Sequence, residues 1–406
     1  MRHPHLDDLR HRFDEFAARV GERARPRARP GGAAGGALSD DYWENVQDLF
    51  TRDVSAREFR DLFTYDTEDT FRFFTREVDL AGVWSRPWYE RYPMAVWKVF
   101  LATAFRLSPA RRIVFAVSVP LLAIGWIRFM AASIAGGQVE VPAIFSLVLI
   151  SASLLFALLM IELRDKLALK GDLEIARQIQ FGLLPFEPFL RPDVAIHAAM
   201  RPANTVGGDY FDIIELGEGR IAFAVGDVAG KGIPAALLMA LLQGSLRTLL
   251  SAGLRGPDLM RTLNAHLYAN IPSNRLITLF YGEYDPGAGA LRYVNGGHNA
   301  PFILRAGAVE RLPATGMALG IVADGAFDAK EATLAPGERL FLFTDGVTEA
   351  FDAQEREYGE ERLEAWLLGH PALPAPALIE GVREDVLAFC GRARPRDDMT
   401  MMIVAR

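Results

Sequence analysis

The feature that most restricts how this chain can fold is an apolar run over residues 141–161, which holds 21 residues and no charged side chain. At 1.5 Å per residue, a helix of this length crosses a bilayer core of roughly 30 Å. A second apolar run, over residues 113–135, precedes it and is interrupted by Pro120 and Arg128. Residues 136–140 alone separate the runs, so we expect a transmembrane helical hairpin within residues 109–162. Because of its interruptions, the first run also fits a buried or interfacial helix.

The charges that flank the two runs predict an orientation. Basic residues precede and follow the pair, whereas the connecting residues contain no lysine or arginine; the flanking residues are Arg106, Arg111, Arg112, Arg164, Lys166 and Lys170. Positive flanks favour the cytoplasmic side, so both termini are expected in the cytoplasm and the chain at the inner (cytoplasmic) membrane. The single cysteine, Cys390, fits a reducing compartment. The net charge of -7 gives no reason to expect nucleic-acid binding.

The residues before the hairpin divide into two parts. Residues 1–40 contain RARPRARPGGAAGGA, whose composition predicts a flexible segment. Residues 41–108 carry apolar side chains near helical spacing among charges, which indicates a helical cytoplasmic region. Its aromatic end fits either anchoring at a membrane interface or a packed helical core; the aromatic residues are Trp84, Trp88, Tyr89, Tyr92 and Trp97.

A helical linker over residues 163–188 is expected to join the second run to the remaining chain. Apolar residues recur there at steps of four, three, three and four, which favours a short two-stranded coiled coil; they are Leu169, Leu173, Ala176, Ile179 and Leu183. The alternative is an amphipathic helix that rests on its own domain.

Four aspartates lie in separate acidic motifs: Asp209 in GGDYFD, Asp227 in VGDVAGKG, Asp345 in FTDGVTEA and Asp397 in DDMT. Carboxylates at glycine-rich strand ends suit hard cations such as Mg²⁺ and Mn²⁺. Asp209 and Asp227 each lie nine residues from Glu218, so an antiparallel hairpin would place them side by side. The other two each adjoin an apolar run that predicts a buried strand. One such motif alone fits an ordinary turn, but the four together indicate a shared metal site.

The pattern of residues 189–406 predicts an α+β layered domain. Strands are expected over 209–216, 220–225, 277–284, 291–294 and 340–344, and helices over 234–251, 257–268, 360–368 and 377–390. Hairpin strands interleaved with paired helices differ from a parallel nucleotide-binding sheet. Lys231 does not lie in a GxxxxGK[ST] motif, which also argues against a phosphate-binding loop of that type.

In this order, GGDYFD, GDVAGKG, NGGHNAP, FTDGVTEA and DDMT resemble the motifs of metal-dependent protein serine/threonine phosphatases, the PPM family, of the bacterial sporulation and stress-response type. The resemblance covers about residues 170–406. It implies two stacked antiparallel β-sheets flanked by α-helices. It also implies a centre of two or more Mn²⁺ or Mg²⁺ ions that activates a water for attack on phosphoserine or phosphothreonine.

The resemblance assigns a role to each matching residue. Asp227 would bridge both metals, and the backbone carbonyl of Val228 would add a ligand. Asp345 and Asp397 would complete the second metal, and Asp209 would bind through water or hold an additional metal. Distant eukaryotic relatives hold phosphate with an arginine upstream of the first acidic motif; Arg201 lies near that place without a matching motif.

The resemblance also bears on residues outside the acidic motifs. His298, in NGGHNAP, is either a general acid for the leaving oxygen or a residue that orders its loop. Lys231 is expected to be solvated, or to assist docking of the substrate. The linkers of similar enzymes end in LLP, dimerise and transmit regulation, which implies a homodimer through five linker residues: Ile175, Ala176, Ile179, Leu183 and Leu184.

The expected function is therefore a membrane-anchored, Mn²⁺- or Mg²⁺-dependent protein phosphatase. By resemblance, its substrate is a phosphorylated signalling protein such as an anti-sigma-factor antagonist. Two other classes stay open at this point: a catalytically silent membrane scaffold that binds phosphoproteins, and a phosphatase of a small phosphorylated molecule.

Overall fold

The structure is a computed structural model that describes residues 87–135, 141–391 and 395–406. The chain divides into two compact units, Met1–Leu158 and Leu159–Arg406. The expected flexible segment over residues 1–40, most of the helical region over 41–108 and the connection over 136–140 lie outside the described residues. These three assignments stay predictions.

Apolar helices dominate the described part of the first unit. It contains α6 (Trp88–Arg106), α7 (Pro109–Ala135) and the start of α8 (Val141–Leu183). Pro120 lies inside α7 without ending it, so the first apolar run is one helix. Many large apolar side chains of α7 and α8 are exposed, including Ile134 and Phe145. An exposed apolar surface of this kind suits a membrane environment.

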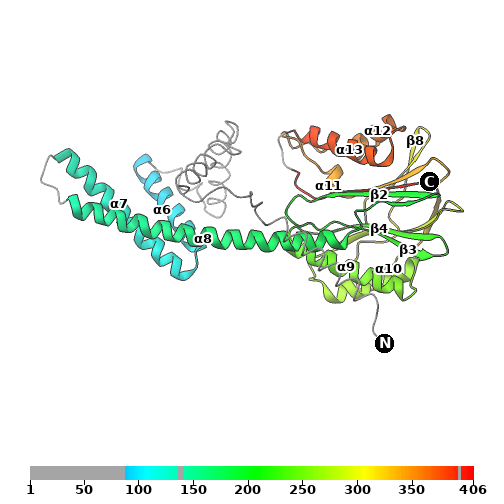
Figure 1. Ribbon diagram of the computed structural model, residues 1–406, viewed down its shortest axis with the longest axis horizontal. Helices are drawn as coiled ribbons and strands as arrows, with labels where there is room; N and C mark the ends of the chain where they lie inside the picture. Colours follow the sequence, from blue (N-terminus) through cyan, green and yellow to red (C-terminus); the bar gives the residue numbers. More distant parts are fainter. Residues whose placement is uncertain (1–86, 136–140, 392–394) are drawn as a thin grey trace, which may run out of the picture. The chain divides into compact units, whose positions relative to one another are not determined.

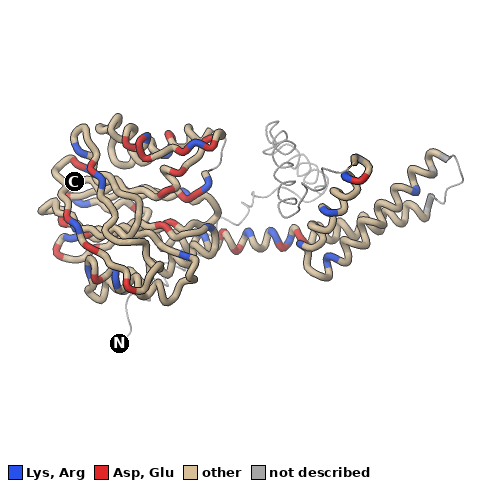
Figure 2. Tube along the Cα trace, turned by 180° about the vertical axis from the view of Figure 1, so that it is seen from behind, with Lys and Arg blue, Asp and Glu red and all other residues tan. Residues whose placement is uncertain are grey.

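Three helices of the described chain are long and apolar enough to cross a membrane by length and composition: Pro109–Ala131, Ala143–Leu183 and Ile233–Ser251. The last of them, α9 (Ile233–Ser251), belongs to the second unit and buries Met239, Leu242 and Leu246 in its core. It is therefore a helix of a folded domain. Charged residues are rare in α7 and in the first part of α8, and become frequent in the second part of α8 (Figure 2).

Two antiparallel sheets form the centre of the second unit, as predicted. The first has the order β3-β4-β5-β6-β9 and the second the order β1-β2-β11-β10-β7-β8. The strands of the first sheet are β3 (Tyr210–Gly217), β4 (Arg220–Val228), β5 (Ile277–Asp285), β6 (Ala290–Gly296) and β9 (Lys330–Thr333). Those of the second are β1 (Phe189–Arg191), β2 (Val194–Arg201), β7 (Phe302–Arg305), β8 (Ala308–Arg311), β10 (Arg339–Phe343) and β11 (Met399–Ala405).

Helices cover the outer face of each sheet (Figure 1). The first sheet carries α9 and α10 (Gly256–Asn270), and the second carries α12 (Glu360–Gly369) and α13 (Ala375–Cys390). One core lies between the sheets and beneath α9 and α10, with Phe211 and Phe280 fully buried. A second core lies beneath α12 and α13 and includes Phe341. Full burial of a side chain of this size contributes about 1.5–3 kcal/mol, so both helical layers are held by apolar packing.

The β3–β4 hairpin has the register that the sequence predicts. Tyr210 pairs with Gly226, which places position 209 opposite position 227. The turn residues Gly217, Glu218 and Gly219 have φ values of 83°, 53° and 78°. Glycine adopts such left-handed conformations without steric cost, so the two glycines allow the tight reversal. The hairpin thereby brings Asp209 and Asp227 to the same end of the sheet.

Candidate metal centre

Acidic residues from four segments meet at one end of the sandwich. Asp209 directly precedes β3, and Asp227 is the last residue but one of β4. Asp345 begins the short helix α11 (Asp345–Thr348), two residues after β10, and Asp397 lies two residues before β11. Because the strands are antiparallel, these starts and ends share one edge. The charges of Asp345, Asp397 and Asp398 all act on Asp227.

Burial and the charges of neighbouring acids make three of these carboxyls, those of Asp209, Asp227 and Asp345, hard to ionise. Burial, followed by the charges of Asp345 and Asp397, raises the pKa of Asp227 to about 7. Burial and then Asp397 raise the pKa of Asp345 to about 6. Burial, Asp227 and Asp398 raise the pKa of Asp209 well above its usual range. Crowded carboxylates of this kind are stabilised by a cation among them.

Two threonines hold Asp209, one directly after β10 and one within β11 of the second sheet. Thr344 Oγ1 donates to Asp209 Oδ2 at 2.8 Å, and Thr400 Oγ1 donates to the same oxygen at 2.5 Å. Asp209 stands at the start of a strand of the first sheet, so these bonds join the two sheets at the acidic end. We did not single out either threonine from the sequence, although each lies in a motif that carries one of the acids, FTDG or DDMT.

Asp398, the second acid of DDMT, was also missed. It is buried, and its two carboxylate oxygens accept from the backbone N–H groups of Ala203 and Gly208, both at 2.7 Å. A Cβ atom at position 207 would overlap the carboxylate of Asp398, so glycine is required for this approach. Asp398 therefore fixes the GGD loop that carries Asp209, and the doubled aspartate was the sequence signal.

The end of α8 binds the same loop. Gln180 Nε2 donates to the carbonyl of Gly207 at 2.7 Å, and the N–H of Gly207 donates to Gln180 Oε1 at 3.1 Å. The Gln180 side chain is buried. The predicted linker residues have different surroundings: Leu184 is buried in the domain, whereas Ile175 and Ile179 are 57% and 63% exposed. The linker thus docks through one face and leaves an apolar face uncovered.

The donor set fits hard cations by its chemistry. Among the described residues, no three acidic, histidine or cysteine side chains already lie close enough to enclose one ion. The repelling carboxylates and the carbonyl of Val228, at the end of β4, nevertheless supply oxygen ligands only, which Mg²⁺ and Mn²⁺ prefer. Lys231 is not simply solvated, because its Nζ lies 2.7 Å from Asp397 Oδ2.

His298 is buried, and its contacts order the NGGHNAP loop. Its Nδ1 lies 2.9 Å from Thr278 Oγ1, and its backbone N–H donates to Asn295 Oδ1 at 2.8 Å. Burial lowers the pKa of His298 to about 4. The ring is therefore neutral near pH 7. A general acid, in contrast, must carry a proton that it can donate at that pH. These observations favour the loop-ordering alternative.

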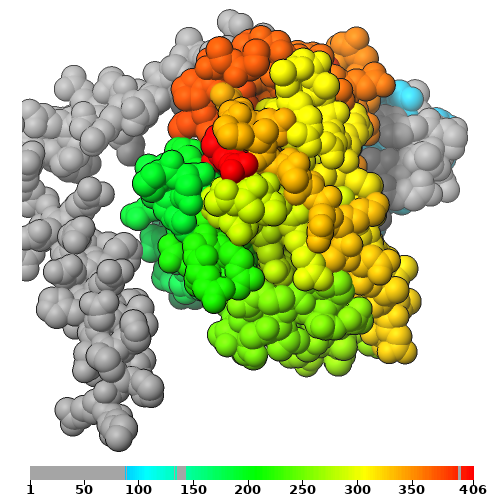
Figure 3. Space-filling view, turned by 90° about the vertical axis from the view of Figure 1, so that its right-hand side faces the viewer, coloured from blue at the N-terminus to red at the C-terminus, as the bar shows by residue number. Residues whose placement is uncertain are grey.

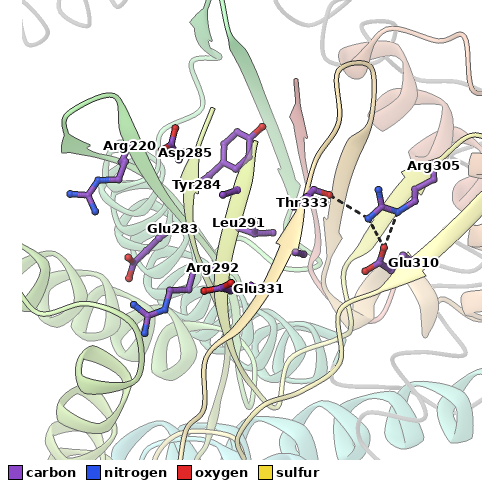
Figure 4. Close-up of a pocket in the computed structure, with 12 residues that line it drawn as sticks. Arg220, Glu283, Tyr284, Asp285, Leu291, Arg292, Arg305, Glu310, Glu331 and Thr333 are labelled. Carbon is purple, nitrogen blue, oxygen red and sulfur yellow. Dashed lines mark hydrogen bonds and ion pairs between the residues drawn. The ribbon is translucent and has the colours of Figure 1, made fainter. Parts of the chain in front are cut away.

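The opposite end of the sandwich carries a pocket of about 560 Å³ (Figure 4). Its lining mixes arginines with carboxylates, among them Arg220, Asp285, Arg292, Arg305, Glu310 and Glu331. Arg305 is ion-paired with Glu310 and Glu338. The chain also ends on this side, between the α12–α13 layer and the α9–α10 layer (Figure 3). The pocket therefore contains none of the residues of the acidic cluster.

Comparisons with known proteins agree with this arrangement. Residues 217–406 match the family model described as Stage II sporulation protein E (SpoIIE). The chain is 30% identical to Protein IcfG of Synechocystis sp. over 266 residues, which cover 58% of this chain and 41% of that protein. It is 28% identical to Phosphoserine phosphatase RsbU of Bacillus subtilis over 241 residues, or 59% of this chain and 71% of that protein. The chain thus matches less than half the length of IcfG.

A solved structure shows the same fold. The SiaA-PP2C domain of Pseudomonas aeruginosa superimposes with a TM-score of 0.54 at 22% identity, over 60% of this chain and 98% of that domain. The architecture of two antiparallel sheets between helical layers is therefore that of a PP2C domain. The second unit of this chain is accordingly a phosphatase domain of the SpoIIE family, within the PPM (PP2C-type) phosphatases.

Proposed function

We propose that this chain is a Mn²⁺- or Mg²⁺-dependent protein phosphatase that hydrolyses phosphoserine or phosphothreonine on a signalling protein. One observation carries the proposal: Asp209, Asp227, Asp345 and Asp397 come from four segments and gather at a single end of the sandwich, where Asp227 acts on Asp209, and Asp345 and Asp397 act on Asp227. The similarity to RsbU, which is named a phosphoserine phosphatase, supports the phosphoserine substrate. The family resemblance of the motifs suggests an anti-sigma-factor antagonist as that substrate.

Each residue of the site has a role in this proposal. Asp227 would be shared by two cations, the Val228 carbonyl would add a ligand, and Asp345 and Asp397 would hold the second cation. When bound, paired cations lower the pKa of a water and neutralise phosphoryl oxygens. The protein contributes a rigid frame, because Thr344 and Thr400 fix Asp209 from the other sheet and Asp398 fixes its loop.

We further propose that the membrane segment controls this site through α8. The helix is continuous from Val141 to Leu183, so its apolar span and the Gln180 contact with Gly207 belong to the same helix. A shift of the helix would move the loop that precedes Asp209.

Ile175 and Ile179 are exposed and would form a homodimeric coiled coil. In the proposed topology, α7 and α8 anchor the chain in the inner membrane with both termini cytoplasmic.

The proposal is tested by phosphate release from the full chain in detergent. A panel of phosphoserine and phosphothreonine peptides and small phosphate esters is incubated with Mn²⁺, Mg²⁺ or EDTA. We expect cation-dependent release from the peptides, and we expect Asp227→Asn to reduce it to background. Asp258→Asn, at an exposed aspartate of α10, is the matched control and should keep full activity.

The same panel distinguishes the other two classes. Release from small esters alone would indicate a phosphatase of small molecules. Binding of phosphopeptides without any release would indicate a silent scaffold. Either result, or unchanged release by Asp227→Asn, would contradict the proposed function.

A further inference from the structure

Arg275 lies against the backbone that follows Asp227. The two strands continue side by side beyond their last pair, Val228 with Ile277, since the N–H of Ala229 donates to the carbonyl of Leu276 at 2.9 Å. Arg275 Nη1 then donates to the carbonyl of Ala229 at 2.6 Å. The guanidinium is thereby held two residues along the chain from the aspartate that is central to the acidic cluster.

The loop is shaped around this guanidinium. Gly230 has a φ of 113°, a conformation that side chains rarely adopt. A Cβ atom at position 230 would overlap Nη1 of Arg275. The backbone conformation therefore requires glycine at position 230, and the guanidinium occupies the space that a side chain there would take.

Arg275 has hydrogen-bonding capacity left over. Within residues 87–135, 141–391 and 395–406, no carboxylate lies within ion-pair distance of its guanidinium, and the one hydrogen bond of the side chain is to the Ala229 carbonyl. A guanidinium has five N–H donors. The other cation of the loop, Lys231, is already paired with Asp397 and bonded to the carbonyl of Arg396. A half-buried cation without a counter-ion is energetically unfavourable, so this position favours a bound anion.

We infer that Arg275 binds the phosphoryl group of the substrate. This inference rests on the proposed function and names the group that holds the phosphate there. The planar guanidinium matches two phosphoryl oxygens at once, and its contact with Ala229 fixes it in orientation. An anionic substrate must approach an end of the domain that is rich in carboxylates, so a cation with free donors at the carbonyl of Ala229, two residues after Asp227, offsets that repulsion. Arg201, which lies near the first acidic motif in sequence, is exposed, and its side chain has no hydrogen bond or ion pair with the described residues.

The test compares Arg275→Gln and Arg275→Lys in the full chain. Charge-assisted hydrogen bonds contribute about 1.5–3 kcal/mol, so Arg275→Gln should raise KM for a phosphopeptide and the inhibition constant of inorganic phosphate by about 10- to 100-fold. Arg275→Lys should recover part of this loss. The affinity for Mn²⁺, measured by calorimetry, should stay within about twofold of wild type. Arg255→Gln is the matched control, because its Nη1 also donates to backbone carbonyls, those of Leu250 and Leu254.

Several results would overturn the inference. It fails if KM and phosphate inhibition are unchanged in Arg275→Gln, or if the loss of Mn²⁺ affinity accounts for the whole effect, since Arg275 would then only support the loop. It also fails if Arg201→Gln produces the effect instead. Calorimetric binding of inorganic phosphate in the presence of Mn²⁺ does not require turnover. A wild-type protein that binds phosphate through Arg275 without hydrolysing any ester would contradict the proposed function and support this inference.

Discussion

The substitution Gln180→Leu tests whether the end of α8 controls the loop that carries Asp209. It keeps the approximate volume of the side chain and removes both hydrogen bonds to Gly207, at 2.7 and 3.1 Å. The Gln180 side chain is 3% exposed, so water does not replace them. Leaving two buried backbone groups without partners costs about 2–4 kcal/mol. For a domain of this size each kcal/mol lowers Tm by about 2–4 °C, so we expect a decrease of at least about 4 °C.

The assay combines thermal unfolding of the full chain in detergent with amide hydrogen exchange. Exchange at Gly207 and Gly208 should accelerate in Gln180→Leu, and cation-dependent phosphate release should fall because Asp209 is no longer held in place. Gln178→Leu is the control, since Gln178 lies on the same helix and is exposed. Wild-type exchange, Tm and activity in Gln180→Leu would refute the coupling between α8 and the site.

Two further predictions concern stability and pH. Arg247→Leu should destabilise the domain by about 2–4 kcal/mol, because the fully buried Asp212 loses two hydrogen bonds from the half-exposed Arg247, at 2.6 and 2.7 Å. Chemical denaturation measures this free energy of unfolding. Adding Asp212→Asn to the variant should restore most of the lost stability. The affinity for Mn²⁺ should fall as the pH falls, since the pKa values of Asp227 and Asp345 are raised to about 7 and about 6 and cations bind the ionised forms. Between pH 7.5 and 5.5 the decrease should be on the order of 100-fold, and a flat calorimetric profile would contradict it.

The sequence predicted those parts of the fold that depend on local patterns. The β3–β4 hairpin was predicted because its turn and its alternating strands are adjacent in the chain, and the observed register places position 209 opposite position 227. The helices α9 and α13 begin within two residues of their expected starts, since apolar periodicity and proline mark them. The strands β1, β2, β7, β8 and β9 were missed. All but β2 have three or four residues, too few for a periodic signal, and the eight residues of β2 alternate in burial only over its first half.

The contacts that complete the site were not predictable in the same way. Thr400 and Asp209 are separated by 191 positions, and Asp398 and Gly208 by 190. No local pattern connects such pairs, because only the packing of the two sheets brings them together. The linker shows the same limit: Ile179 and Leu184 were both assigned to one dimerising segment, yet Ile179 is exposed and Leu184 lies in the domain core.

The most direct test of the central claim is a calorimetric titration of Mn²⁺ into the full chain, with Asp227→Asn and Asp258→Asn beside the wild type. If acids from four segments form one centre, wild type and Asp258→Asn should bind at least two ions per chain, and Asp227→Asn should lose the binding of more than one. Wild-type stoichiometry and affinity in Asp227→Asn would contradict the account.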